Sequence, residues 1–249
     1  MVQPDAVPSD ASELDGSNAH RVGVAAQVIV ADLDDPAGPL LDPASLHHLS
    51  RVLRLRAGET VCAADGMGGW QRCTFGGTER LEPTGVGGRV PAPAHGVTVA
   101  FVPVKGDRPE LVVQKLTELG VDSIAVTSSE RSVVRWDGER AEKHLVKLRR
   151  VALEATQQCR RLWLPTVEQR PLATLVEDGV SLADMGGAPV TAECRAIVVG
   201  PEGGWSDAER SLAATAGAAS TEPVGLGEHV LRAETAAIAA GVLLTAMRR

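Results

Sequence analysis

The stretch GLGEHVLRAET, residues 225–235, and its upstream counterpart GPEGGWSDAE, residues 200–209, decide the fold that this sequence predicts. Each follows a short apolar run, residues 196–199 and 223–226, which is typical of a buried strand, and each leads into a helical pattern. In such a strand–loop–helix unit, glycine lets the backbone approach a ligand closely, and the helix start presents unpaired N–H groups. Two such loops on consecutive strands predict a cleft with two backbone-lined walls.

Strands and helices are predicted to alternate through the last three-fifths of the chain. Apolar runs predict strands, as at residues 97–104, and helical spacing predicts helices, as at residues 140–160. This alternation favours a mostly parallel sheet with helices on both faces. We therefore predict an α/β domain over residues 97–249, after the Pro-rich connector PAPAH at residues 91–95.

The part of the chain before the connector has a different character. Residues 1–26 are rich in Asp, Ser, Ala and Pro, and they are predicted to form a disordered acidic tail. The β-branched run of residues 27–33 predicts the first strand, and short runs between glycines from residue 59 to 90 predict a small β-barrel or meander. We therefore expect a second domain over residues 27–94.

A short helix is expected inside this second domain, in the stretch DPASLHHLSRVLRLRAG at residues 42–58. Asp42 or Ser45 can cap its amino-terminal end. Helical spacing is predicted to turn four apolar side chains inward, namely Leu46, Leu49, Val52 and Leu53. The opposite face, which we expect to be exposed, carries His47, His48, Arg51 and Arg54.

The distribution of charge favours RNA as a partner, although the net charge is −7. Residues 131–161 contain nine Lys or Arg against four acids, and residues 44–57 contain no acid at all. Phosphate binding depends on such clusters of basic residues. Because aromatic residues make up 2% of the chain and tyrosine is absent, a base-stacking platform is not expected. Any RNA contact is therefore predicted to depend on charge and shape.

Several other classes of protein are disfavoured by the sequence. No apolar run approaches the ~20 residues of a membrane span, and no signal peptide is predicted, so we expect a cytoplasmic chain. The four cysteines have no paired spacing, and no His, Cys and carboxylate grouping has metal spacing, so no metal site is expected. The phosphate-binding P-loop, the dinucleotide fingerprint and the Gly-x-Ser-x-Gly motif are also absent.

The two glycine-containing stretches also have purely structural interpretations. Residues 206–209, SDAE, form a capping box that explains the start of a helix without any ligand. The preceding GPEGG suits a tight turn as well as it suits a ligand loop. In the second stretch, Arg232 and Glu234 stand at the start of a helix whose body, residues 236–244, is apolar. Charged residues in that position favour a functional role.

A family resemblance adds to this interpretation. Both stretches, extended to LGEHVLRAETA at residues 226–236, resemble in order and spacing the RsmE family of 16S ribosomal RNA uracil-N3 methyltransferases, which belong to the SPOUT class. Three shorter segments agree: ELG at 118–120, ERS at 130–132 and EATQQCRR at 154–161. The resemblance implies a SPOUT-type parallel sheet with a C-terminal deep trefoil knot, and a PUA-like RNA-binding β-barrel at the N-terminal end.

The resemblance also implies a cofactor, a substrate and an assembly. S-adenosylmethionine would be held in the knot by Val199, Gly200, Glu202, Gly203, Gly204, Leu226, Gly227, Val230, Leu231, Arg232 and Thr235. The substrate would be 16S ribosomal RNA within the small ribosomal subunit, and the enzyme would be a homodimer. Phosphates of the RNA would be bound by basic side chains, for which we select His48, Arg51, Arg54, Arg131 and Arg161.

The chemistry of the substrate suggests the catalytic roles. Because N3 of uracil is protonated and weakly nucleophilic, the enzyme must help to remove its proton and align the nitrogen with the methyl donor. Arg232 is predicted to orient the uracil or to stabilise its developing negative charge. Glu234 or Glu202 is predicted to be the base, although water could serve, and each glutamate could instead cap a helix or pair with an arginine.

Two other functions remain open on the sequence alone. The chain could be a SPOUT methyltransferase that acts on transfer RNA or on another base. It could also be a non-catalytic RNA-binding or ribosome-assembly factor that keeps the fold. Cofactor binding separates the last alternative from the others, because a pure RNA binder has no need of two intact glycine loops.

Overall fold

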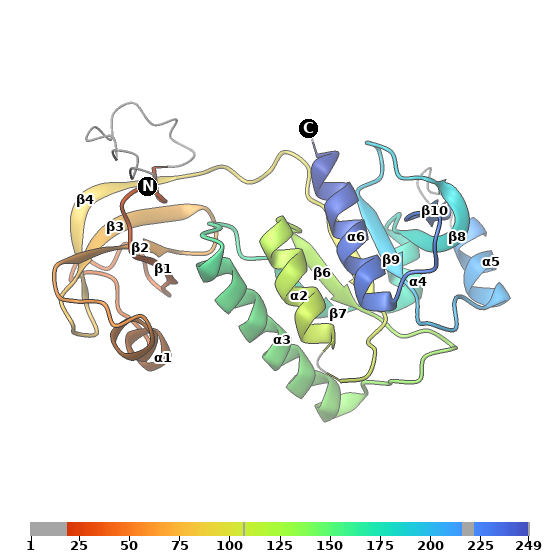
Figure 1. The fold of residues 1–249 in the computed structure, drawn as a ribbon, viewed down its shortest axis with the longest axis horizontal. Helices are drawn as coiled ribbons and strands as arrows, with labels where there is room; N and C mark the ends of the chain where they lie inside the picture. Colours follow the sequence, from red (N-terminus) through yellow and green to blue (C-terminus); the bar gives the residue numbers. More distant parts are fainter. Residues whose placement is uncertain (1–18, 107, 216–221, 249) are drawn as a thin grey trace, which may run out of the picture. The chain divides into compact units, whose positions relative to one another are not determined.

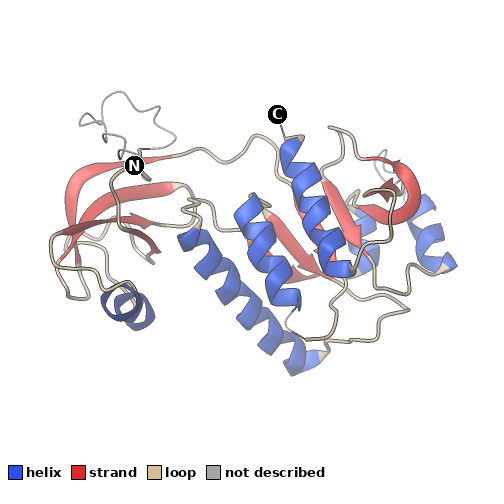
Figure 2. Cartoon of the chain, in the orientation of Figure 1, coloured by secondary structure: helices blue, strands red, loops and turns tan. Residues whose placement is uncertain are grey.

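The computed structural model describes residues 19–106, 108–215 and 222–248. The chain divides into two compact units, Met1–Ala92 and Pro93–Arg249, and the division falls inside the Pro-rich connector. Each unit has a sheet of its own (Figures 1 and 2). The two units are therefore described separately.

The first unit contains one four-stranded sheet. Its strands lie in the order β1-β2-β3-β4, with β1 parallel to β2 and the other pairs antiparallel. Between the described strands, the pairings run from β1 to β4 without joining β4 to β1. Apolar side chains such as Leu49, Phe75 and Leu81 fill its core. The strands are β1 (Ala26–Ile29), β2 (Glu59–Ala64), β3 (Gly69–Phe75) and β4 (Leu81–Arg89).

The ordered part of this unit begins before residue 27. Val24 is 7% exposed, and the backbone N–H of Ala25 donates to the carbonyl of Thr60 at 2.8 Å. The guanidinium of Arg72 donates to the carbonyls of Ala19 and Val22. The prediction of a disordered tail through residue 26 is therefore corrected for residues 19–26, and its remainder, residues 1–18, lies outside the described residues.

The predicted helix in this unit exists, but its second half faces differently. Helix α1 (Pro43–His47) is capped by Asp42, whose carboxylate accepts from the N–H groups of Ala44 and Ser45. It continues as the π-helical turn η2 (His48–Val52). Leu49 is fully buried, whereas Val52 and Leu53 are 59% and 43% exposed, which corrects their predicted inward orientation. The i→i+5 hydrogen bonding of the π turn rotates these residues away from the core.

The second unit contains a six-stranded sheet in which every pair is parallel. The strand order is β10-β8-β9-β5-β6-β7. This arrangement confirms the predicted α/β fold with a parallel sheet. The strands are β5 (Thr98–Phe101), β6 (Ser123–Val126), β7 (Thr166–Gln169), β8 (Ser181–Pro189), β9 (Ala196–Val199) and β10 (Val224–Gly225).

Helices cover both faces of this sheet, as predicted (Figure 1). Because successive side chains of a strand point to opposite faces, Val99 and Phe101 pack with α2, α3 and α6, whereas Ala100 and Val102 pack with α4 and α5. Two separate cores therefore hold the sheet in place. The helices are α2 (Arg108–Leu119), α3 (Gly138–Gln158), α4 (Leu172–Glu177), α5 (Asp207–Thr215) and α6 (Ala233–Ala246).

Candidate functional site

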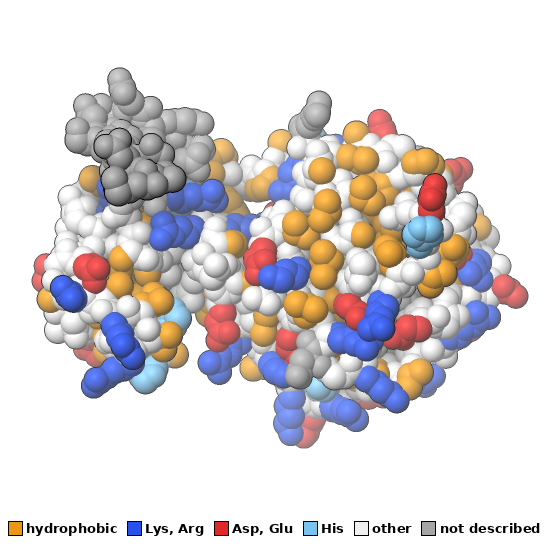
Figure 3. Space-filling view, viewed as in Figure 1, with side chains coloured by type: hydrophobic (Ala, Val, Ile, Leu, Met, Phe, Trp, Pro, Cys, Tyr) orange, Lys and Arg blue, Asp and Glu red, His pale blue; other side chains and the backbone are white. Residues whose placement is uncertain are grey.

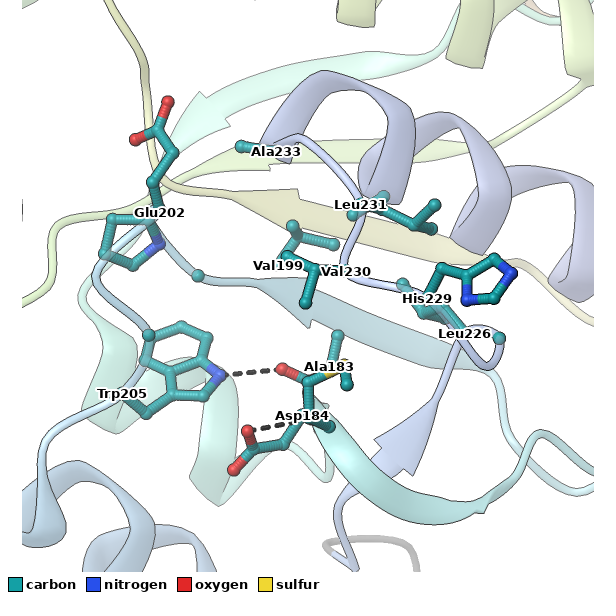
Figure 4. Close-up of a pocket in the computed structure, with 16 residues that line it drawn as sticks. Ala183, Asp184, Val199, Glu202, Trp205, Leu226, His229, Val230, Leu231 and Ala233 are labelled. Atoms are coloured by element: carbon teal, nitrogen blue, oxygen red, sulfur yellow. Dashed lines mark hydrogen bonds between the residues drawn. The ribbon is translucent and has the colours of Figure 1, made fainter.

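The loops that follow β9 and β10 and a segment inside β8 line one pocket in the second unit (Figure 4). The two predicted glycine loops follow β9 and β10, but β8 lies between these strands in the sheet. Its residues Ala183, Asp184 and Met185 add a third wall that the sequence prediction missed. The signal was present, because an apolar run leads there into a polar residue and the pair Gly186 and Gly187.

Most of the predicted cofactor residues meet in this pocket. Those that line it are Val199, Gly200, Glu202, Gly204, Leu226, Gly227, Val230 and Leu231. Gly203, Arg232 and Thr235 are not among the lining residues. The structure adds lining residues that the sequence did not single out, namely Ala183, Asp184, Met185, Pro201, Trp205, His229, Ala233 and Ala236.

Trp205 joins the first glycine loop to strand β8. Its indole N–H donates to the carbonyl of Ala183 at 2.9 Å, and the residue is 1% exposed (Figure 4). A Cβ atom on Gly200 would lie 2.9 Å from the indole ring. The loop therefore requires glycine at this position, because the backbone passes directly against the ring.

An ion pair fixes the pocket wall that β8 contributes. The carboxylate of Asp184 accepts from Nε of Arg210 at 2.7 Å and from the backbone N–H of Met185 at 2.9 Å. Arg210 also donates to the carbonyl of Trp205 at 2.8 Å. The hydrogen bond from Arg210 holds the pKa of Asp184 below its usual value. Asp184 is therefore an ionised and preoriented acceptor beside the pocket at neutral pH.

Helix α5 begins with the predicted capping box. The backbone N–H of Ser206 donates to the Glu209 carboxylate at 2.8 Å, and the N–H of Glu209 donates to Ser206 Oγ at 3.1 Å. This reciprocal pairing satisfies two N–H groups at the helix start. The sequence interpretation of residues 206–209 as a helix start is therefore confirmed.

The two candidate bases share one cation, Arg108. Its Nη1 lies 3.7 Å from Glu202 Oε1 and 3.6 Å from Glu234 Oε2. The predicted alternative that each glutamate pairs with an arginine is thus realised for both. Glu202 lines the pocket and its side chain is 57% exposed, whereas Glu234 is 13% exposed and does not line it. Arg108 could not be selected from local patterns, because its partners lie far along the chain.

Arg232 stands at the N-cap position of α6, where its carbonyl accepts from the N–H of Ala236 at 2.8 Å. Its side chain is exposed and has no ion-pair partner among the described residues. The neighbouring Leu231 lines the pocket. Arg232 is therefore beside the pocket and available to a ligand.

The predicted RNA-binding residues divide into two groups. His48, Arg51, Arg54 and Arg131 are exposed. Arg161 is not, because its Nη2 lies 2.5 Å from Asp122 Oδ1 and its side chain is 13% exposed. Burial lowers the pKa of Arg161. Its guanidinium holds α3 to the start of β6, so its assignment as an RNA contact is corrected.

Neither a metal-binding cluster nor a membrane-spanning helix is found in the part of the chain that the structure describes. No group of three or more His, Cys, Asp or Glu side chains in it is placed to hold a metal ion. None of its helices combines the length and the apolar character that crossing a membrane requires.

Comparison with known proteins assigns the class of this chain. Residues 91–245 match the family model of an RNA methyltransferase domain, and residues 41–80 match that of an RNA methyltransferase PUA domain. A protein of Synechocystis sp. named ribosomal RNA small subunit methyltransferase E is 32% identical, over 88% of this chain and 74% of that protein. The chain therefore belongs to the ribosomal RNA small subunit methyltransferase E family.

Solved structures resemble the chain over most of its length. A protein of Legionella pneumophila, in complex with the bound cofactor SAM, has a TM-score of 0.72 at 29% identity and covers 88% of this chain and 96% of that one. A ribosomal RNA small subunit methyltransferase E of Neisseria gonorrhoeae was solved bound to S-adenosyl methionine. It has a TM-score of 0.72 at 25% identity, and the match covers 87% of this chain and 94% of that one. Both structures thus share the fold and contain the same cofactor.

We expect the Arg210→Gln variant to have a lower free energy of unfolding than the wild-type protein at neutral pH, and we expect this difference to be smaller in acid. The lowered pKa of Asp184 contributes stability that is fully present above its unfolded pKa and disappears as the pH falls through the folded pKa. Urea unfolding of both proteins near pH 7 and near pH 3 measures the two losses. Arg140→Gln is the control, because it removes the same charge from an arginine that has no ion-pair partner among the described residues. An equal loss at both pH values would contradict the expectation.

Proposed function

We propose that this chain is an enzyme that transfers the methyl group of S-adenosylmethionine to N3 of a uridine in 16S ribosomal RNA. One observation carries the proposal: the loops after β9 and β10 and the segment of residues 183–185 in β8 form a single pocket in the part of the chain that matches an RNA methyltransferase domain. Two proteins of the same fold were solved with this cofactor bound. The names of the relatives support a ribosomal RNA substrate of the small subunit.

The pocket residues fit this cofactor in kind. Gly204 and Gly227 have φ angles of +68° and +151°, which favour glycine, and Gly200 has no room for a side chain. Backbone N–H and C=O groups of these loops are thus close enough to bind a nucleoside, and Leu226 and Leu231 offer apolar contacts. When bound, S-adenosylmethionine supplies an activated methyl group. The protein's remaining task is to position the uracil and its proton.

The exposed arginine beside the pocket suits the orientation of the uracil. Arg232 can donate to a uracil oxygen, because its guanidinium is exposed and carries donors in a fixed geometry. Such donors stabilise the negative charge that develops as the N3 proton leaves. N3 lies on the Watson–Crick edge, so the target base has to be unpaired or flipped out of its helix.

Glu202 is better placed than Glu234 to accept the N3 proton. It lines the pocket, whereas Glu234 faces Arg108 with a carboxylate that is mostly buried. Arg108 contacts both carboxylates and compensates part of their negative charge. Glu234 then has the supporting role of holding Arg108 beside Glu202. Water remains the alternative acceptor of the proton.

The remaining parts of the proposal concern the architecture. The C-terminal loops around the pocket would form the deep trefoil knot of the SPOUT class, and the first unit would close as a PUA-like RNA-binding barrel. The match of residues 41–80 to a PUA domain supports the second point. Four exposed side chains would contact RNA phosphates, namely His48, Arg51, Arg54 and Arg131.

Assembly as a homodimer in the cytoplasm completes the proposal. Leu111 of α2 and Val242 of α6 are 41% and 44% exposed, and Figure 3 shows apolar side chains gathered over α6. Burial of exposed apolar surface is the main driving force for association. Action on another RNA or base, or RNA binding without catalysis, is separated from this function by the experiments below.

We expect the wild-type protein to form 3-methyluridine when labelled S-adenosylmethionine is mixed with small ribosomal subunits that lack this modification. Arg232→Ala should lower kcat about 10²- to 10³-fold, the usual cost of removing a donor to a developing anion. Nucleoside analysis of the RNA identifies the methylated base. Glu228→Ala is the control, since Glu228 is exposed in the same loop and does not line the pocket. Another methylated nucleoside, or none, would contradict the proposed reaction.

Gly200→Ala should weaken the binding of S-adenosylmethionine about tenfold or more. The added Cβ would lie 2.9 Å from the Trp205 ring, and such overpacking costs about 1–3 kcal/mol. Gly203→Ala is the matched control, because its Cβ would meet Arg131 at an ordinary 3.5 Å. Isothermal titration calorimetry measures both affinities. Equal losses in the two variants would show that Gly203 also contacts the cofactor.

Glu202→Gln should lower kcat about 10²- to 10⁴-fold if Glu202 is the general base. Glu234→Gln should have a smaller effect on kcat, because it removes only a partner of Arg108. Single-turnover methyl transfer with the cofactor prebound isolates the chemical step in both variants. The opposite order would assign the base to Glu234, and normal rates in both variants would leave the proton to water.

A further inference from the structure

The segment after β6 is fastened to the first glycine loop by a buried carboxylate. Glu209, in the first turn of α5, is 6% exposed. Besides its capping-box contact, it accepts from the backbone N–H of Glu130 at 3.0 Å and from Ser129 Oγ at 3.2 Å. These donors lie about eighty positions earlier in the chain. The capping residue therefore also holds a distant loop.

The energetics of Glu209 make this contact hard to replace. A buried carboxylate is costly unless its oxygens accept hydrogen bonds. Its hydrogen-bond donors among the described residues are neutral groups, namely the N–H groups of Ser206 and Glu130 and the hydroxyl of Ser129. Leaving any of them unpaired costs about 1–3 kcal/mol. The segment 129–130 is therefore held in one position relative to the start of α5.

Arg131 extends this connection to the pocket wall. Its Nη1 donates to the carbonyl of Gly203 at 3.0 Å, while the residue as a whole is exposed. The turn that presents it is tightened by Ser132, whose Oγ accepts from the N–H of Ser129 at 2.9 Å. A guanidinium has five N–H donors, so one contact to Gly203 leaves others to meet an RNA phosphate. Arg131 thus contacts the loop of residues 200–204 while part of its side chain is exposed to solvent.

We propose that Glu209 and Arg131 couple RNA binding to cofactor binding, an inference that rests on the proposed function and deepens it. Glu209 is a positioning residue that places Arg131, and Arg131 contacts both an RNA phosphate and the loop of residues 200–204. A phosphate that fixes Arg131 restrains one wall of the pocket. A cofactor held by that wall in turn restrains Arg131. Such coupling is reciprocal, so each ligand strengthens the binding of the other by the same factor.

The decisive measurement is the affinity for S-adenosylhomocysteine, which does not react, with and without small ribosomal subunits that lack the methyl group. Equilibrium dialysis of the labelled compound gives both dissociation constants. We expect binding to be about fivefold or more tighter in the presence of the subunits, the lower end of typical couplings. Arg131→Gln should bring this ratio to within about twofold of one, and the ratio is the test whatever the variant's affinity as a free protein.

Matched variants separate this role from loss of charge and from damage to the fold. Arg135→Gln removes the same charge from the same exposed segment and should weaken RNA binding while keeping the ratio. Glu209→Gln should bring the ratio of dissociation constants close to one. The double variant Glu209→Gln/Arg131→Gln should have the same ratio as Glu209→Gln alone. Because Glu209→Gln could impair folding, Ser129→Ala is the second variant: it keeps the capping box and should lower the ratio and speed hydrogen exchange in residues 128–132.

The outcomes distinguish this inference from the proposed function. An unchanged ratio in Arg131→Gln, or one that falls equally in Arg135→Gln, overturns the coupling. A wild-type protein that transfers methyl groups but has a ratio of one also overturns the coupling, and the proposed function then stands. A wild-type protein that binds no S-adenosylhomocysteine overturns both.

Discussion

The hydrogen bond from the indole of Trp205 to the carbonyl of Ala183 determines the geometry of the candidate site. It ties the loop after β9 to strand β8 and places a large ring directly against Gly200. The Trp205 side chain is buried, and a buried N–H left without an acceptor would be costly, so the loop and the strand stay together. The pocket depends on this link, because its walls come from segments that are separate in the chain. Asp184 and Arg210 reinforce the same junction from its solvent side.

Acidic residues lie around the pocket in a chain of net charge −7, and four of them have partners within the protein. Asp184 pairs with Arg210, Glu202 and Glu234 share Arg108, and Glu209 is satisfied by neutral donors. The acids are thus engaged within the protein, whereas Arg232 is left exposed. Basic and acidic side chains also alternate across the surface in Figure 3. We therefore expect RNA recognition by this chain to depend on local charge, in keeping with the short range of electrostatic interactions in salt.

Local patterns predicted the features of this fold whose causes are local. The bounds of β9, the capping box at residues 206–209 and the parallel sheet all followed from periodicity and cap chemistry. The orientation of Val52 could not be predicted, because a π-helical turn changes the hydrogen-bond pattern without changing the residue pattern. Arg161 was misassigned because its partner Asp122 is distant in sequence. The wall formed by Ala183 was missed because strand order is a property of the assembled sheet.

The strand order of the second unit has a consequence for its synthesis. Strand β5 pairs with β9, joining residues 98–101 to residues 196–199, and β10 pairs with β8 although β9 and α5 lie between them in the chain. Arg248, at the other end of α6, binds Asp122 beside the start of β6. Contacts of this range are slow to form, because long loops must close first. The pocket therefore cannot be complete until residues 226–236, which form its last wall, have been synthesised and have left the ribosome.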